Sequence, residues 1–302
     1  MKNQDLIDQI NELKEKKNAV ILVHNYQRPE IYKVADFIGD SYDLSKKATE
    51  TKAAIIVFCG VDFMAESAYI LNPKKIVLIP TKLAKCPMAA MVDVNGLKEF
   101  KLKYPEAAVV SYVNTSAEIK AESDICCTSS NAVKVVNSLE ENEIIFVPDS
   151  NLASYVIKNT KKKIIPWRGW CYVHNKFSLE GLIQSKAIHL DAKVLVHPEC
   201  TPEIVELADE VCSTSGMINY VRQSKENKFI IATEIGLIER LRIEFPDKLF
   251  FQAPPGGICF QMKKITLTLV FNSLKNEQFK VTIPEDIRVR AKNALDRMLS
   301  VG

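Results

Sequence analysis

Short apolar runs alternate with amphipathic stretches along the chain from Ala19 onward, and each apolar run ends in polar or turn residues. β-branched runs of this length predict buried strands, and the stretches between them predict helices. In the first third of the chain the predicted strands cover residues 20–23, 36–41, 53–58 and 75–79. Strands that alternate with helices in this way predict parallel βαβ units in an α/β fold.

The same order of four strands recurs twice. The second set covers 108–113, 123–129, 144–147 and 163–165, and the third covers 193–196, 209–214, 229–232 and 248–251. One pair of offsets, 88 and then 85 residues, aligns three sets of positions: His24, Tyr112 and His197; Asp36, Asp124 and Asp209; Val61, Asp149 and Glu234. A shared register at separate strand ends predicts an internal triplication, with three four-stranded parallel sheets.

The termini add helices to this triplicated pattern. Residues 1–17 place Leu6, Ile7, Ile10 and Leu13 on one helical face, and residues 266–274 and 285–299 also predict helices. We expect the C-terminal pair to pack on the first repeat. The predicted domains are therefore residues 1–95 with 264–302, residues 96–182 and residues 183–263.

Composition narrows the class of protein. The chain has 302 residues, 47% of them hydrophobic and 25% charged, with a net charge of +3. This balance gives no reason to expect a nucleic-acid or membrane partner. The N-terminus lacks the apolar core of a signal peptide, and no run approaches a membrane span. We expect a cytoplasmic protein, whose eight cysteines are thiols or metal ligands rather than disulfides.

Polar residues cluster just after the predicted strands. In parallel sheets, ligands bind beyond the carboxyl ends of the strands, so three sheets with converging ends would enclose one central site. The candidates are His24, Tyr26, Ser41, Tyr112, Asn114, Ser129, His197, Glu199, Ser213 and Thr214.

Three cysteines occupy equivalent loops after the fourth strand of each repeat. Cys86, Cys171 and Cys259 are separated by 85 and 88 residues, and Pro or Gly flanks each loop, where backbone amides can bond to sulfur. Three thiolates suit a zinc ion with one water, or a [4Fe–4S] cluster with one open iron. Ordinary free cysteines, which pack as small hydrophobes, are the third alternative. His174 is either a fourth ligand or a surface or capping histidine.

Several segments together resemble one enzyme family. They are His24-Asn25-Tyr26-Gln27, Gly39-Asp40-Ser41, Gly60-Val61-Asp62-Phe63-Met64-Ala65-Glu66, Cys86-Pro87-Met88-Ala89, Tyr112-Val113-Asn114, His197-Pro198-Glu199-Cys200 and Thr233-Glu234-Ile235-Gly236. In this order and spacing the chain resembles the quinolinate synthases, iron–sulfur enzymes of de novo NAD biosynthesis. The resemblance covers the chain from about Ala19 through Lys263.

The resemblance implies a fold and a cofactor. It implies three pseudo-equivalent α/β/α three-layer domains in a pseudo-threefold arrangement. It also implies one [4Fe–4S] cluster per chain, held by Cys86, Cys171 and Cys259. Some relatives carry a CxxCxxC motif at the third ligand; Cys259 stands alone here, so no redox switch of that kind is expected.

The implied reaction condenses iminoaspartate with dihydroxyacetone phosphate to give quinolinate, phosphate and two waters. Because this balance is redox-neutral, the open iron is expected to act as a Lewis acid. An aspartate oxidase or dehydrogenase is expected to supply the iminoaspartate, and the chain is expected to be a monomer or a homodimer.

Proton transfers around imines and enols need general acids and bases. Glu199, beside His197, is the predicted base, and Tyr26 and His24 form the corresponding pair in the first repeat. Ser129, Ser213 and Thr214 are predicted to hold a phosphate or carboxylate at helix N-termini, with helix capping as the alternative for the serines. The polar ring is completed by Ser41, Tyr112 and Asn114, and Tyr112 is alternatively a core tyrosine.

Two other functions stay open on the sequence alone. One is a zinc-dependent hydrolase or lyase with the same three cysteine ligands, and the other is a non-enzymatic iron–sulfur sensor. The strand-end histidines, glutamate and tyrosines favour an enzyme, because a sensor does not need them.

Overall fold

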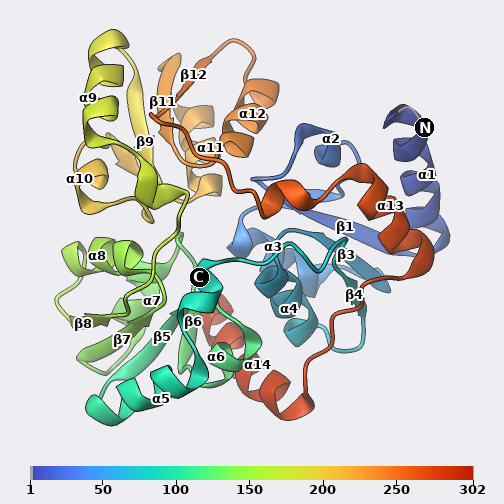
Figure 1. Cartoon of the computed structure of the whole chain (residues 1–302), viewed down its shortest axis with the longest axis horizontal. Helices are drawn as coiled ribbons and strands as arrows, with labels where there is room; N and C mark the ends of the chain where they lie inside the picture. Colours follow the sequence, from blue (N-terminus) through green and yellow to red (C-terminus); the bar gives the residue numbers. More distant parts are fainter. Residues whose placement is uncertain (1–2, 302) are drawn as a thin grey trace.

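The computed structural model describes residues 3–301, which form three α/β units, each built on a four-stranded parallel sheet flanked by helices (Figure 1). The predicted fold class is therefore confirmed. The first sheet has the order β2-β1-β3-β4, and the other two repeat it as β6-β5-β7-β8 and β10-β9-β11-β12. The strands are β1 (Ala19–His24), β2 (Phe37–Gly39), β3 (Ile55–Cys59), β4 (Ile76–Leu78), β5 (Ala108–Tyr112), β6 (Ile125–Cys127), β7 (Glu143–Val147), β8 (Lys163–Pro166), β9 (Lys193–Val196), β10 (Glu210–Val211), β11 (Lys228–Ala232) and β12 (Leu249–Gln252).

Helices connect these strands in every unit. The α-helices are α1 (Asn3–Lys16), α2 (Pro29–Tyr32), α3 (Ser41–Glu50), α4 (Asp62–Leu71), α5 (Val94–Lys103), α6 (Ala117–Ala121), α7 (Ala132–Ser138), α8 (Ser150–Lys158), α9 (Leu179–Ile188), α10 (Pro202–Val205), α11 (Thr214–Gln223), α12 (Ile235–Glu244), α13 (Leu267–Asn276) and α14 (Glu285–Val301). Three 3₁₀ turns follow the cysteine loops: η1 (Met88–Met91), η2 (His174–Lys176) and η3 (Met262–Lys264). No described helix is both long enough and apolar enough to cross a membrane.

The same backbone-to-carboxylate hydrogen bond occurs at the equivalent position of each unit. A carboxylate before the second strand accepts a backbone N–H from the first strand, 15 residues earlier, in all three units. The bonds are Ile21 to Asp36 (2.7 Å), Val109 to Asp124 (2.7 Å) and Val194 to Asp209 (2.8 Å). A hydrogen bond to a charged group contributes about 1.5–3 kcal/mol, so the same device stabilises each connection. The predicted equivalence of the three aspartates is confirmed.

The order of each sheet fixes where a site forms. Successive connections leave the first strand toward opposite edges of the sheet, so the chain reverses between β1 and β3 and at the equivalent places in the other units. Crevices open at the carboxyl ends of the strands at such switch points. The three units surround a common centre, which these ends face (Figure 1).

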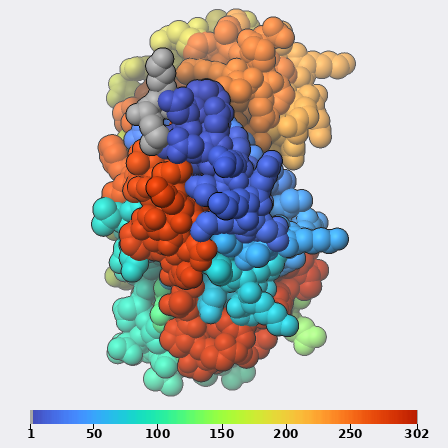
Figure 2. All heavy atoms as spheres, turned by 90° about the vertical axis from the view of Figure 1, so that its right-hand side faces the viewer, coloured from blue at the N-terminus to red at the C-terminus, as the bar shows by residue number. Residues whose placement is uncertain are grey.

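The two C-terminal helices pack on different units. Helix α13 lies against α1 and β3, and Figure 2 shows this orange-red segment beside the dark blue N-terminal helix. Helix α14 lies mainly against α6 and β6 of the second unit, with a smaller contact to α4. The expectation that both pack on the first unit is therefore wrong for α14.

The composition of α14 explains this placement. Its buried face includes Ala291 and Ala294, and small residues allow close approach to the short helix α6. Arg290 pairs with Glu122 at 2.8 Å, and Arg297 donates to the carbonyl of Asp124 at 2.7 Å. The predicted domain boundaries remain a prediction.

The apolar cores are not shared equally. The first unit and one face of the second sheet form one continuous core that includes both C-terminal helices. The third unit has a separate core on each face of its own sheet. Near the centre it meets the first unit through buried hydrogen bonds, Asn25 Nδ2 to Thr214 Oγ1 (2.8 Å) and Ser213 Oγ to Asp40 Oδ2 (2.9 Å).

Candidate active site

The carboxyl ends of the three sheets line one cavity. All of the residues proposed from the sequence line it except Ser213. The Ser213 hydroxyl is used elsewhere: it caps α11 by accepting the Gly216 N–H at 3.2 Å and donates to Asp40 Oδ2. The capping alternative therefore describes Ser213, while its neighbour Thr214 lines the cavity.

Two histidines occupy equivalent positions and have equivalent hydrogen bonds. The Tyr26 N–H donates to His24 Nδ1 at 3.1 Å, and the Glu199 N–H donates to His197 Nδ1 at 3.3 Å. A neutral imidazole has one acceptor and one donor nitrogen, so Nε2–H is the donor on both rings. Burial lowers the pKa of each ring to about 3, which keeps both neutral near pH 7. Each ring therefore offers the cavity an uncharged hydrogen-bond donor.

Glu199 is the centre of the polar network. Its side chain is almost fully buried, it accepts a short hydrogen bond from the Tyr112 hydroxyl, and its Oε2 lies 2.7 Å from His174 Nδ1. Burial alone would raise the pKa of Glu199, but the facing His174 and the hydrogen bond from Tyr112 hold the pKa below its ordinary value. Glu199 is thus an anionic hydrogen-bond acceptor that faces hydrogen-bond donors.

The network continues from His174 into the first unit. His174 Nε2 lies 2.8 Å from Thr233 Oγ1, which lies 2.7 Å from the Tyr26 hydroxyl. An unbroken series of contacts therefore joins Tyr112, Glu199, His174, Thr233 and Tyr26 across all three units. Burial, and then the charge of Glu199, raises the pKa of both tyrosines well above the ordinary value, so both are protonated donors.

Sequence reasoning missed part of this series. Thr233 directly follows β11, and its place at the carboxyl end of a strand is the signal that could have found it. His174 is neither on the surface nor a capping residue: it is 1% exposed, and both its nitrogens face protein groups. The alternative of a fourth metal ligand stays a prediction, since the ligand atoms of Cys171, His174 and Glu199 lie within 4.8 Å of one another.

Opposite the histidines, the cavity wall offers polar atoms without cationic side chains. Asn114 Oδ1 is buried with no hydrogen-bond partner among the described residues, and no described lysine or arginine lines the cavity. Ser41 and Thr214 are the first residues of α3 and α11. At α3 the N–H groups of Tyr42 and Asp43 already donate to the Asp40 carboxylate, so the N-terminus of α11 is the more suitable of the two for a phosphate or a carboxylate.

The three cysteines share one local geometry. Each precedes a 3₁₀ turn, and the backbone N–H of the third residue after it points at its sulfur: Ala89 for Cys86, His174 for Cys171 and Met262 for Cys259. Hydrogen bonds from backbone N–H groups to sulfur stabilise metal-bound thiolates. Burial is the largest factor that raises the pKa of each thiol, and charge at the other cysteines raises it further for Cys86 and Cys171.

The spacing of the sulfurs limits the kind of metal. Among the described residues, the ligand atoms that lie mutually within 4.8 Å are those of Cys171, His174 and Glu199. The three thiols do not form such a group, so at least one pair of their sulfurs is farther apart. Sulfurs around one tetrahedral zinc, at about 2.3 Å from the ion, would be separated by about 3.8 Å. As placed in this structure, the three thiols therefore do not form the compact set that one tetrahedral ion would require.

The remaining cysteines lie outside the cavity. Cys59 is in β3, Cys126 and Cys127 are in β6, and Cys200 donates to the Ala232 carbonyl. Cys212 follows β10 and lies against Gly216.

Comparison with known proteins agrees with this geometry. The family described as quinolinate synthetase A protein matches residues 8–300. Quinolinate synthase 1 of Methanosarcina acetivorans is 56% identical over 301 residues, covering 100% of this chain and 99% of the relative. Quinolinate synthase of Alkaliphilus metalliredigens is 51% identical over 302 residues and covers 100% of both chains. A third relative, from Geobacter metallireducens, is 50% identical over 301 residues, with 100% and 99% coverage. The chain therefore belongs to the quinolinate synthase family.

Proposed function

We propose that this protein condenses iminoaspartate with dihydroxyacetone phosphate to quinolinate, with release of phosphate and two waters. We further propose that Cys86, Cys171 and Cys259 hold one [4Fe–4S] cluster with an open iron. The observation that carries the proposal is the arrangement of the cavity: three partly buried thiols, one from each unit, face the same space as a buried acid–base series.

The cysteine loops support a cluster by their chemistry and their spacing. Each sulfur receives backbone N–H groups, and the three sulfurs do not all lie within 4.8 Å of one another. When bound, such a cluster would supply a Lewis acid that stabilises negative charge on a substrate oxygen or nitrogen. The chemistry of the other residues is that of binding and proton transfer.

Glu199 is the proposed base. Its carboxylate is held anionic, and it lies in the cavity where an acidic C–H or N–H of a bound substrate would be placed. When Tyr112 or Tyr26 gives its own proton to a departing hydroxyl, the proton taken by Glu199 replaces it, directly at Tyr112 and through His174 and Thr233 at Tyr26. Tyr26 and Tyr112 are the proposed acids, because a protonated phenol can donate to a departing hydroxyl.

The substrates carry several negative charges, and neutral donors are proposed to bind them. His24 and His197 present Nε2–H to substrate carboxylates. Ser41, Ser129 and Thr214 are proposed to bind the phosphate at the strand-to-helix junctions, where the N-terminus of α11 adds positive potential. The unpartnered amide oxygen of Asn114 is proposed to accept a hydrogen bond from a substrate N–H or hydroxyl.

Two expectations about partners remain proposals. An aspartate oxidase or dehydrogenase supplies iminoaspartate, and the chain acts as a monomer or a homodimer.

A second function is favoured by one observation. Cys171, His174 and Glu199 form a compact group that could hold a single zinc ion, as in a hydrolase or lyase. Zinc at this place would use Glu199 and His174 as ligands, so that they would no longer link Tyr112 to Thr233 and Tyr26. It would also leave Cys86 and Cys259 without a role.

The test is product formation. Anaerobically purified protein is mixed with dihydroxyacetone phosphate and with iminoaspartate generated in the assay from oxaloacetate and ammonia. We expect quinolinate and phosphate in a 1:1 ratio. Iron-loaded protein that forms no quinolinate would overturn the proposed reaction.

A further inference from the structure

Carboxylates at the N-terminal ends of helices accept hydrogen bonds from the backbone N–H groups of the cysteine loops. Asp62 Oδ1, at the start of α4, accepts the backbone N–H of Cys86 at 3.2 Å. Glu234 caps α12, and its Oε1 accepts the backbone N–H of Cys259 at 3.1 Å. These bonds restrain the main chain of a proposed metal ligand rather than its sulfur.

The second unit repeats the arrangement with looser geometry. Asp149 caps α8 through Oδ1 and faces the backbone N–H of Cys171. Its Oδ2 is buried and has no partner within hydrogen-bond geometry among the described residues. The carboxylate position is thus a feature of all three units.

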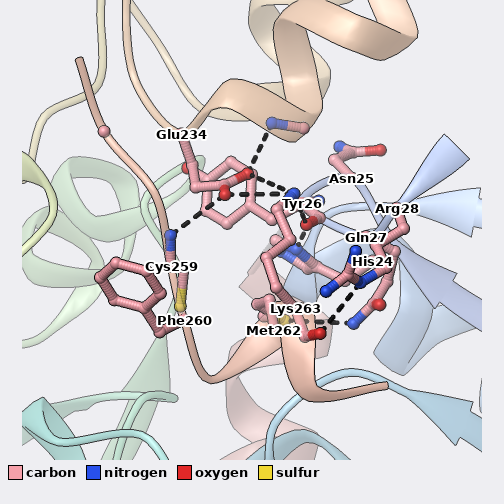
Figure 3. Close-up of polar contacts among 12 residues, drawn as sticks. His24, Asn25, Tyr26, Gln27, Arg28, Glu234, Cys259, Phe260, Met262 and Lys263 are labelled. Carbon is pink, nitrogen blue, oxygen red and sulfur yellow. Dashed lines mark hydrogen bonds and ion pairs between the residues drawn. The ribbon is translucent and has the colours of Figure 1, made fainter. Parts of the chain in front are cut away.

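Only the third of these carboxylates lies in an ion pair among the described residues. Lys263 Nζ lies 3.1 Å from Glu234 Oε1 and 3.2 Å from Oε2, and it donates to the Tyr26 carbonyl at 2.7 Å (Figure 3). Glu234 is fully buried and also accepts the Gly236 N–H at 2.7 Å. One ion pair therefore touches both the loop of Cys259 and the loop of Tyr26.

Packing around this pair leaves no free space. A β-carbon on Gly236 would lie 2.7 Å from Lys263 Nζ, 2.8 Å from Glu234 Oε2 and 2.8 Å from the carbonyl carbon of Tyr26. Real side chains essentially never approach so closely, so only glycine fits here. Arg28 ties the two loops together again, because its Nε donates to the Lys263 carbonyl at 3.0 Å.

We propose that Glu234 and Lys263 act as one positioning unit that fixes Cys259 and Tyr26 relative to each other. Glu234 sets the main chain of the ligand, and Lys263 sets the main chain of the proposed acid. A group behind a metal ligand typically changes metal affinity or activity by about 10–100-fold when it is removed. This role rests on the proposed function, because it assumes a metal at Cys259 and a reaction at Tyr26.

The role is tested with Lys263→Met, Glu234→Gln and the double variant, all as anaerobically purified holoprotein. In Glu234→Gln the side-chain amide keeps the shape of the carboxylate. Its NH₂ group, however, is a hydrogen-bond donor and would face the N–H donors of Cys259, Gly236 and Lys263. Lys263→Met keeps an unbranched apolar side chain of similar length and removes the positive charge. The readouts are the rate of iron release to a chelator, measured well below the melting temperature, and the separate values of kcat and KM.

We expect each single variant to release iron about tenfold faster and to lose about tenfold in kcat, with KM changed less than threefold. Because the two residues act together, the double variant should be no worse than the more affected single variant. Lys17→Met is the matched control, since it breaks another 3.1 Å lysine–glutamate pair, with Glu277, outside the cavity. It should match the wild type in both readouts.

Wild-type iron release and kcat in Lys263→Met would overturn the positioning role, as would additive losses in the double variant. If Glu234→Gln does not fold, Lys263→Met alone decides, because its side chain is partly exposed. The wild type in the same series tests the function separately. A wild type without iron would overturn the proposed function and, with it, the positioning role.

Discussion

His174 Nδ1 lies 2.7 Å from Glu199 Oε2, and the two side chains are only 2% and 4% exposed. The histidine comes from the turn after the Cys171 loop, and the glutamate comes from the loop after β9 in the third unit. The contact therefore connects the turn that follows Cys171, a proposed metal ligand, to Glu199, the proposed base. Both side chains are shielded from bulk water, so changes at either residue are expected to affect the other.

The first prediction concerns the base itself. Glu199→Gln keeps the size of the side chain but cannot take a proton, so kcat should fall at least about 100-fold, the usual contribution of a general base. Iron content should stay at the wild-type level. Glu206→Gln, which changes an exposed glutamate paired with Lys158, serves as the control. Near-normal kcat in Glu199→Gln would remove Glu199 as the base.

The second prediction concerns the relay residue Thr233. Thr233→Val preserves the shape and removes the hydroxyl that bridges His174 and Tyr26. We expect kcat to fall about tenfold with iron content unchanged, and we expect Thr233→Ser to retain most of the wild-type rate. Steady-state kinetics of the two variants decide the matter: equal rates in the valine and serine variants would exclude a role for the hydroxyl.

The third prediction separates a cluster from a single ion. Cys86→Ala, Cys171→Ala and Cys259→Ala should each lose the iron, because all three ligands are needed. A mononuclear site at Cys171, His174 and Glu199 would instead lose its metal in Cys171→Ala alone.

Two buried cysteines outside the cavity are the controls for this series. Cys59→Ala and Cys200→Ala should keep both iron and activity, since neither sulfur lines the cavity. Metal analysis of the five purified proteins provides the measurement. Loss of iron in Cys200→Ala with retention in Cys171→Ala would contradict the ligand assignment.

The fourth prediction concerns pH and Asp40, the buried cap of α3. Burial, and then the neighbouring charge of Asp43, raises the pKa of Asp40 from its ordinary value of 3.8 to about 6. The folded chain thus binds the proton more tightly than the unfolded chain, so this residue makes folding less stable as pH rises from about 4 to about 6. Between pH 7 and pH 5 the wild type should gain about 1.5 kcal/mol from this group.

Asp40→Asn should lack this gain, because asparagine caps the helix without titrating. Urea unfolding of both metal-free proteins at pH 5 and pH 7 measures the difference. The same pH dependence in the variant and the wild type would show that Asp40 is not the group responsible.

The sequence predicts the strands and their register well, because apolar runs and the repeated aspartates Asp36, Asp124 and Asp209 are local signals. Strand ends also identify the lining of the cavity, since parallel sheets place them together. Contacts between units carry no such signal. Thr233, the buried place of His174 and the Lys263 ion pair depend on how three units meet, and no periodicity encodes that.

The placement of α14 shows the same limit. Its amphipathic pattern predicts a helix with one buried face, but that pattern is equally compatible with the first or the second unit. Arg290 and Arg297 direct it to α6 and β6, through partners far away in the sequence. Ser213 is a further case, because the sequence does not tell whether a serine before a helix caps it or faces a ligand.

The central claim is that three thiols from three units hold one open [4Fe–4S] cluster. The most direct measurement is the iron and acid-labile sulfide content of the anaerobically purified chain, read together with its absorption spectrum. The account predicts about four irons and about four sulfides per chain with broad absorption near roughly 400 nm. A colourless protein that holds one zinc ion per chain would contradict it.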